Sequence, residues 1–234
     1  MKLRDYQLEA IRKMKTGCIL NGGVGSGKSL TSLSYYYMQN GGSEIFLTGG
    51  KHKKMKDPKD LYIITTARKR DTMEWEGELS HFLLSTNPDT SAYKNKVIVD
   101  SWNNVKKYKE VKGAFFIFDE QRVVGSGEWV KSFLKIAKSN EWILLSATPG
   151  DTWSDYIPVF IANGFYKNKS EFLREHAVFA RYSKFPKIEK WMGSGKLNRY
   201  RRMILVDMKF QRKTEQHHDD IYVDYDIATY KDVM

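Results

Sequence analysis

The sequence contains one cysteine, Cys18, and no apolar run near the about 20 residues that a membrane-spanning helix needs. A single cysteine excludes an intrachain disulfide and a cluster of thiolate metal ligands. The apolar neighbours of Cys18 indicate a buried core thiol. The first residues, Met1 to Asp5, lack the apolar segment of a secretory signal. We therefore expect a cytoplasmic protein without a membrane segment.

Acidic residues are scarce relative to basic ones. Asp and Glu total 28 against 39 Lys and Arg, which gives a formal net charge of +11. Such an excess favours a polyanionic partner, with nucleic acid as the first candidate. Charge alone is equally compatible with a basic surface that only aids solubility. The 234 residues allow one large domain, or a domain with an appendage.

The stretch from Gly22 to Ser29 matches G-x-x-x-x-G-K-[ST], the phosphate-binding loop of P-loop NTPases. It follows a short apolar run and precedes a segment compatible with a helix, which is the context that the motif requires. Glycines let successive N–H groups turn inward, and the helix adds its positive end. Lys28 would reach the β- and γ-phosphates, and the Ser29 hydroxyl would bind Mg²⁺. The further residues expected to hold the nucleotide here are Gly23, Gly25, Ser26 and Gly27.

Two carboxylates follow the apolar run 115–118, which is typical of a strand buried on both faces of a sheet. Asp119 and Glu120 would therefore lie at the carboxyl end of a central parallel strand, where α/β sheets bind their ligands. We expect Asp119 to hold Mg²⁺, directly or through water. Glu120 would orient and deprotonate the attacking water. The alternative, two surface acids after a strand, is disfavoured by the P-loop.

Apolar strands are predicted at 17–20, 61–64, 97–99, 115–118 and 142–145, and helical patterns separate them. This alternation predicts an α/β fold with a mostly parallel sheet and helices on both faces. Asp5 is expected to cap the first helix, and Trp75, Leu79, Phe82 and Leu83 to form the buried face of another. Thr152 and Asp155 are spaced as a capping box.

The polar, basic segment 49–59 reads as a surface loop, either merely solvated or in contact with a phosphate backbone. The region 181–213 is rich in Lys and Arg with interspersed aromatic residues. It suits a nucleic-acid face or an interdomain linker. A late strand is predicted at 221–225. His217 to Asp220 reads as a polar turn rather than a set of metal ligands.

Five short stretches, in chain order, resemble motifs of the first ATPase lobe of superfamily 2 helicases and translocases. Within that superfamily they are most similar to Swi/Snf-type double-stranded DNA translocases, as found in phage genomes. The stretches are Leu3 to Gln7, Gly22 to Ser29, Thr65 to Trp75, Asp119 to Arg122 and Ser146 to Pro149. The resemblance implies a RecA-like P-loop lobe over 1–180, which uses ATP and Mg²⁺. It implies a basic extension and linker over 181–234, leading towards a second lobe.

The resemblance also implies roles for single residues. Gln7, in a motif with Arg4, would read adenine, since its amide offers a donor and an acceptor to the N6/N7 edge. Ser146 and Thr148 would lie between nucleotide and DNA and report the state of the γ-phosphate. DNA, more as a duplex than as a single strand, is the expected partner. The candidate contacts to its backbone are Thr66, Arg68, Lys69, Ser101 and Trp102.

The sequence departs from this subgroup in two places. Motif II reads Asp-Glu-Gln-Arg where Asp-Glu-x-His is usual, and Gln121 can still hydrogen-bond towards motif III or the γ-phosphate. The family also needs a second RecA-like lobe with an arginine finger, and the chain stops at Met234, where that lobe should begin. The second lobe is therefore expected in cis, in a longer chain, or in trans, from a partner.

We thus expect an ATP-dependent DNA helicase or translocase lobe that binds ATP but hydrolyses it slowly when alone. A non-catalytic or regulatory nucleic-acid-binding module that kept the fold is the main alternative, and the intact Lys28, Asp119 and Glu120 speak against it. A P-loop ATPase of another branch, such as a packaging motor or an AAA-type loader, is disfavoured by Gln7 and the Ser-Ala-Thr-Pro stretch.

Overall fold

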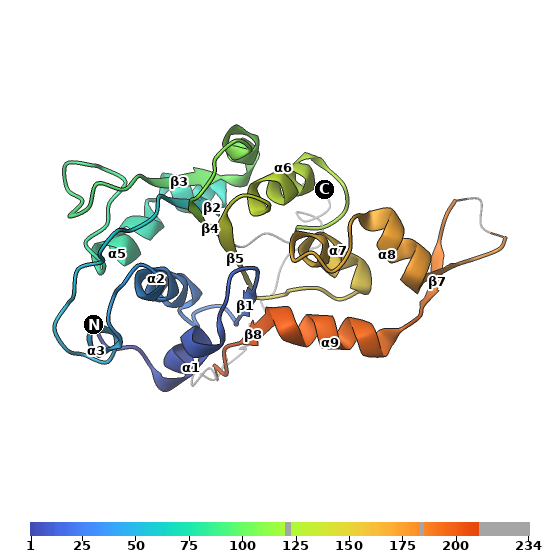
Figure 1. Cartoon of the computed structure of the whole chain (residues 1–234), viewed down its shortest axis with the longest axis horizontal. Helices are drawn as coiled ribbons and strands as arrows, with labels where there is room; N and C mark the ends of the chain where they lie inside the picture. The colour runs from blue at the N-terminus through green and yellow to red at the C-terminus, as the bar shows by residue number, and fades with distance from the viewer. Residues whose placement is uncertain (120–122, 183–184, 211–234) are drawn as a thin grey trace, which may run out of the picture.

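The computed structural model describes residues 1–119, 123–182 and 185–210. Its centre is a six-stranded sheet with the order β3-β2-β4-β5-β1-β8, in which every neighbouring pair is parallel (Figure 1). The strands are β1 (Ile19–Asn21), β2 (Leu61–Thr65), β3 (Val97–Ser101), β4 (Phe115–Asp119), β5 (Glu141–Ser146) and β8 (Leu205–Asp207). The predicted α/β fold with a parallel sheet is confirmed. The predicted strand 221–225 and the turn at His217 lie outside the described residues.

Alternating side chains of the sheet enter two separate hydrophobic cores. Phe115 and Ile117 of β4 belong to one core, and Phe116 and Phe118 belong to the other. All five residues of β4 are buried, which explains why its sequence is a continuous apolar run. The helices that supply the first core include α1 (Asp5–Lys13), α2 (Lys28–Gln39), α3 (Glu44–Leu47) and α5 (Glu74–Ser80). Those of the second include η1 (Trp102–Tyr108), α6 (Glu128–Ala137) and α7 (Trp153–Ala162).

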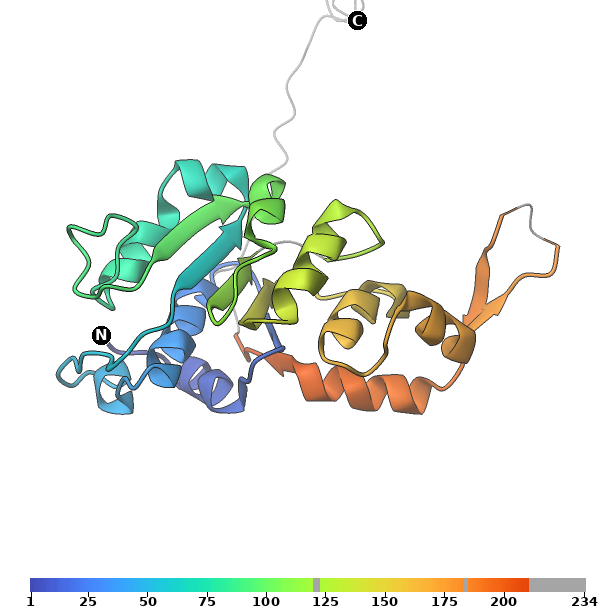
Figure 2. The same cartoon turned by 45° about the horizontal axis from the view of Figure 1, so that its top comes forward.

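The chain leaves the sheet after β5, continues through α7, and returns to the sheet at β8. It forms α8 (Lys169–His176), the antiparallel hairpin of β6 (Ala177–Phe179) and β7 (Ile188–Trp191), and α9 (Ser194–Ile204). Figures 1 and 2 show this hairpin at one extremity of the molecule, at the opposite end from α3. After α9, β8 pairs with β1 in the register Ile19 to Leu205. The boundary at residue 180 stays a prediction, and α9 and β8 lie beyond it.

Several local expectations are confirmed and two are wrong. Cys18 is fully buried, and burial raises the pKa of its thiol to about 11. The Thr152 capping box forms, since the Thr152 N–H donates to the Asp155 carboxylate at 2.9 Å. Asp5, however, is the first residue inside α1, and Arg4 is the N-cap.

The second error concerns the end of α5. The helix stops at Ser80, and Leu83 has a left-handed backbone with φ of 59° and is 42% exposed. Phe82 is still fully buried, and Leu84 takes the inward position that helical spacing had assigned to Leu83. The helical period fails because the chain turns before that residue. No helix in the described ranges is long and apolar enough to cross a membrane.

Candidate nucleotide-binding site

The P-loop spans residues 22–27, between the end of β1 and the start of α2. Gly25 and Gly27 both have φ of 78°, a left-handed conformation that L side chains rarely adopt. Gly27 is the N-cap of α2. The Gly22 N–H donates to the Ser146 carbonyl oxygen at 3.1 Å, which ties the loop to the end of β5. The strand–loop–helix context that the motif requires is therefore present.

Lys28 lies over its own loop. Its Nζ donates to the carbonyl oxygens of Gly22 at 2.6 Å and Gly23 at 3.0 Å. Ser29 follows it in the first turn of α2 and is partly buried, while Ser26 is fully buried. A flexible ammonium beside the loop backbone is suited to hold phosphate oxygens as a point charge.

Asp119 ends β4 and is 1% exposed. Its Oδ2 accepts a hydrogen bond from Thr65 Oγ1 at 2.8 Å and an ion pair from Lys69 Nζ at 3.1 Å. The Trp102 indole N–H donates to the Asp119 carbonyl oxygen at 2.9 Å. The carboxylate is thus fixed from two neighbouring elements, and a cation already compensates its charge.

One cleft of about 720 Å³ gathers most of the predicted nucleotide residues. Its predicted members are Gly25, Gly27, Lys28, Ser29, Asp119, Ser146 and Thr148. Ser146 closes β5 and is 5% exposed, and its Oγ accepts from the Thr148 N–H at 3.1 Å. These two residues therefore join the P-loop cleft to the loop that follows β5. Glu120 and Gln121 lie outside the described residues.

Four residues that line the cleft were not among the residues predicted to bind the nucleotide. Glu78 lines the cleft without having been predicted, Val24 and Ala147 lie in predicted motifs without having been singled out, and Lys69 had been assigned to the DNA backbone. Burial raises the pKa of the Glu78 carboxyl above its ordinary value. Thr65 had a readable signal, since it is a polar residue at the carboxyl end of a buried parallel strand. Glu78 had none, because its position depends on how α5 packs.

Gln7 lies beside the P-loop rather than in the cleft lining. It is 5% exposed, and its Oε1 accepts from the Arg4 N–H at 3.0 Å. Its Nε2 donates to Thr31 Oγ1 at 3.2 Å and is 3.5 Å from the Gly27 carbonyl oxygen. Both ends of the amide therefore have protein partners in this structure, while Arg4 is exposed. The reading of adenine by Gln7 and Arg4 stays a prediction.

The five predicted DNA-backbone residues are divided between surface and interior. Arg68 is exposed, and Thr66 caps α4 (Ala67–Asp71) by accepting from the Lys69 N–H at 3.3 Å. Ser101 and Trp102 are 2% and 3% exposed. The Trp102 ring packs on Phe118 at 5.4 Å between centroids, so its side chain supports β4 from within.

The oxygen donors in the cleft fit a hard cation. Ser29 would offer a hydroxyl and Asp119 a carboxylate, and Mg²⁺ is commonly held by one or two carboxylates, substrate phosphates and water. Within the described ranges no group of three or more His, Cys, Asp or Glu could hold a metal. A magnesium ion held by Ser29 and Asp119 would take the rest of its shell from phosphate oxygens and water.

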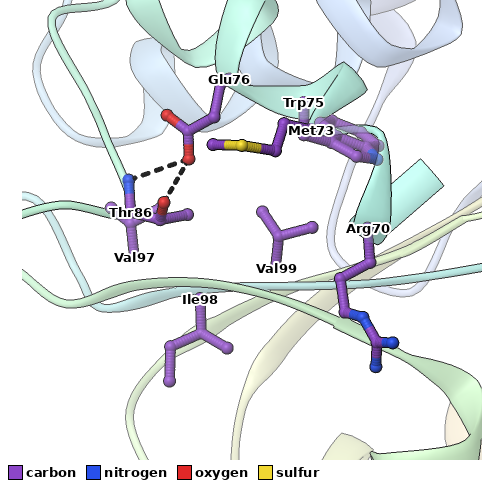
Figure 3. Close-up of a pocket in the computed structure, with 8 residues that line it drawn as sticks. All are labelled: Arg70, Met73, Trp75, Glu76, Thr86, Val97, Ile98 and Val99. Atoms are coloured by element: carbon purple, nitrogen blue, oxygen red, sulfur yellow. Dashed lines mark hydrogen bonds between the residues drawn. The ribbon is translucent and has the colours of Figure 1, made fainter. Parts of the chain in front are cut away.

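A second cavity, of about 340 Å³, lies between α5 and the edge strand β3 (Figure 3). Arg70, Val97 and Val99 are among its lining residues. On one side the Glu76 carboxylate accepts from the Thr86 N–H at 3.2 Å. None of the predicted site residues lines this cavity, and its apolar strand residues make it unlike a phosphate site.

Comparison with known proteins gives similarity at the level of fold. No family model and no curated protein matches the chain. The Sulfolobus solfataricus SWI2/SNF2 ATPase core in complex with dsDNA aligns at a TM-score of 0.61 and 18% identity, over 88% of this chain and 44% of that one. The SWI2/SNF2 ATPase core domain of the same organism aligns at 0.53 and 17%, over 88% and 43%. The Pyrococcus furiosus Hef helicase domain aligns at 0.45 and 17%, over 76% and 41%.

The chain spans less than half the length of each of these proteins. At such identities the likeness concerns the fold, and it rests on the two SWI2/SNF2 structures. The six-stranded parallel sheet, covered on both faces, resembles the fold of the SWI2/SNF2 ATPase cores.

Proposed function

We propose that this chain is the ATP-binding lobe of a DNA helicase or translocase, which couples ATP hydrolysis to movement on DNA. The observation that carries the proposal is the convergence of the P-loop, Asp119, Ser146 and Thr148 on one cleft. The likeness of the fold to SWI2/SNF2 ATPase cores supports it.

In this proposal the chain's own residues hold a nucleoside triphosphate at its phosphates. Lys28 would exchange the carbonyl oxygens of Gly22 and Gly23 for phosphate oxygens. Ser29 and Asp119 would hold Mg²⁺, which when bound neutralises charge on the phosphates. Gln7 and Arg4 would contact the adenine base beside the P-loop.

Hydrolysis would depend on two further residues. Glu120 would orient and deprotonate the attacking water, and Gln121 would connect the γ-phosphate to Ser146 and Thr148. Phosphoryl transfer of this kind relies on positioning and charge, and an arginine finger contributes about 10³–10⁵ in rate. A second RecA-like lobe, in cis or in trans, would supply that arginine. We therefore propose slow turnover by this chain alone.

DNA is the proposed track, and a duplex is favoured over a single strand. One of the similar SWI2/SNF2 cores was solved in complex with dsDNA. Arg68 on α4 is the exposed candidate for contact with the DNA backbone. It is adjacent in sequence to Lys69, which lines the cleft.

Nucleotide binding and turnover by three variants test the proposal. A fluorescent ATP analogue should bind the wild type with Mg²⁺ and bind Lys28→Ala at least about tenfold more weakly, since a charge-assisted contact to phosphate is lost. Glu120→Gln should keep binding and lose turnover. The exposed Lys138→Ala, at the end of α6, is the matched lysine control and should match the wild type. Equal binding and turnover in all four proteins would instead favour a non-catalytic nucleic-acid-binding module.

A further inference from the structure

Most of the excess positive charge of the chain is concentrated in one segment. Residues 163–204, named here the basic arm, contain eleven Lys and Arg against three Glu, while the whole chain has 39 Lys and Arg against 28 Asp and Glu. The basic arm therefore carries +8 of the total +11. It comprises α8, the β6–β7 hairpin and α9. The remainder of the chain, which contains the nucleotide cleft, is close to neutral.

The hairpin is the part of the basic arm that projects furthest from the sheet (Figures 1 and 2). Its strands pair antiparallel from Ala177–Trp191 to Phe179–Ile188, and the Ala180 N–H donates to the Lys187 carbonyl oxygen at 2.9 Å. None of the hairpin residues that the structure describes lines the nucleotide cleft. Whatever it contacts is therefore bound apart from ATP.

Aromatic rings are exposed along this hairpin and at its tip. Tyr182 is 99% exposed, Phe185 is 72% exposed and Phe179 is 43% exposed. Isolated exposed apolar residues are ordinary, but three rings on one short hairpin form a group that water solvates poorly. The same hairpin exposes the cations Arg181, Lys187 and Lys190. No ion pair within the described ranges involves these three side chains.

The base of the hairpin, in contrast, is firmly packed. His176 is 1% exposed, its Nε2 is 2.7 Å from the Tyr166 hydroxyl and its Nδ1 is 2.9 Å from the Met192 carbonyl oxygen. The Phe172 and Trp191 rings pack edge to face, with centroids 5.7 Å apart. Tyr182 and Phe185 thus belong to a hairpin whose base is packed, which reduces the entropy lost when a ligand binds.

We propose that the basic arm is a nucleic-acid-binding element separate from the ATP cleft, in which its cations contact phosphates and Tyr182 and Phe185 stack on unpaired bases. Cations that track a backbone, combined with aromatic faces, are the features that bind single-stranded nucleic acid. An acidic protein would match the charge, but it would give the exposed rings no bases to stack on. This inference rests on the proposed function only in taking DNA as the nucleic acid.

Binding of a fluorescent 20-nucleotide oligothymidylate, measured by anisotropy, tests the stacking. Base–aromatic stacking is worth about 1–3 kcal/mol per base, so Tyr182→Ala and Phe185→Ala should each weaken single-strand binding by about 5- to 150-fold. Binding of a blunt duplex should change much less, because its bases are already stacked. Binding of the fluorescent ATP analogue should be unchanged, which also verifies folding. Ile45→Ala, which removes a 68% exposed apolar side chain on α3, is the control.

Salt dependence tests the phosphate contacts. Lys187→Ala with Lys190→Ala should lower the slope of log affinity against log salt by about 1.4, because each phosphate contact to a single strand contributes about 0.7. Lys131→Ala with Lys138→Ala removes the same charge from exposed positions in and after α6 and should leave the slope unchanged.

Three outcomes would overturn the inference. They are wild-type affinity for oligothymidylate in the Tyr182 and Phe185 variants, an equal loss of slope in both lysine pairs, and a wild type that binds ATP but no oligonucleotide. A wild type that binds oligothymidylate through the basic arm but does not bind ATP would contradict the proposed function alone.

Discussion

Lys69 holds its ammonium 3.1 Å from Asp119, the carboxylate expected to carry magnesium. The pair is largely removed from water, with the Lys69 side chain 20% and the Asp119 side chain 1% exposed. Lys69 and Mg²⁺ would therefore compete for the same oxygen. Lys69, which the sequence predicted as a contact to the DNA backbone, therefore contributes its positive charge to the cleft.

Lys69→Met should destabilise the nucleotide-free protein by up to about 3 kcal/mol, because a buried carboxylate loses a cation that partly compensates its charge. Saturating Mg²⁺ and ADP should reduce this loss, since the metal would compensate Asp119 instead. Urea unfolding with and without the nucleotide measures both effects. Arg68→Met, on the exposed neighbour in α4, should change stability by less than about 0.5 kcal/mol. The same loss for Lys69→Met under both conditions would argue against competition at Asp119.

Glu78 gives a second residue-scale prediction, from its raised pKa. Its pKa in the folded state exceeds that of the unfolded chain, so the unfolded state ionises first as pH rises. The wild type therefore loses stability from about its ordinary value of 4.5 upward. Glu78→Gln should be more stable than wild type at pH 7, by on the order of 1 kcal/mol or less, and the difference should vanish below pH 4. Urea unfolding across pH 4 to 8 would reveal it, and a pH-independent difference would exclude ionisation of Glu78 as its cause.

At the scale of elements, the P-loop is fixed by contacts with α1. Gly27 has φ of 78°, and a Cβ there would lie 2.7 Å from Gln7 Nε2. Gly27→Ala should therefore cost about 1–2 kcal/mol from the left-handed backbone and should also weaken ATP binding, because Gln7 has to move. Thermal unfolding and titration with the fluorescent nucleotide measure these effects.

Gly77 provides the matched control for this substitution. It lies inside α5, and a Cβ there would have no neighbour within 4 Å. Gly77→Ala should stabilise the protein by about 0.4–1 kcal/mol, because alanine restricts the unfolded chain and favours a helix. If both alanine variants behave alike, the conformation of the P-loop glycine is not what limits stability.

The elements also show where prediction from the sequence succeeds. Apolar runs such as 115–118 predicted the buried strands, because burial directly constrains residue type. The motif from Gly22 to Ser29 predicted the P-loop, because its turn geometry constrains residue type in the same way. The three-residue β8 had no such signal, since its place depends on pairing with β1. Lys69 and Glu78 line the cleft because of the way α4 and α5 pack. Local sequence patterns do not encode this packing.

At the scale of the whole molecule, the cleft contains phosphate-binding and magnesium-binding candidates, while the proposed arginine finger belongs to a second lobe. We predict that the isolated monomer binds ATP and shows turnover about 10³-fold or more below that of a two-lobed enzyme. A coupled assay on material shown to be monomeric, with and without duplex DNA, provides the measurement. Rapid DNA-stimulated turnover by the monomer would mean that this chain supplies every catalytic group.

The position of β1 between β5 and β8 has a consequence for the order of folding. Ile19 pairs with Leu144 on one side and with Leu205 on the other. β1, which leads into the P-loop, is thus among the first strands to be synthesised and among the last to pair with a strand on each side. At about 5–20 residues per second, the ribosome takes about 10–40 seconds to reach β8. Until then β1 keeps one unpaired edge, although the residues that line the nucleotide cleft, the last of which is Thr148, have already been synthesised.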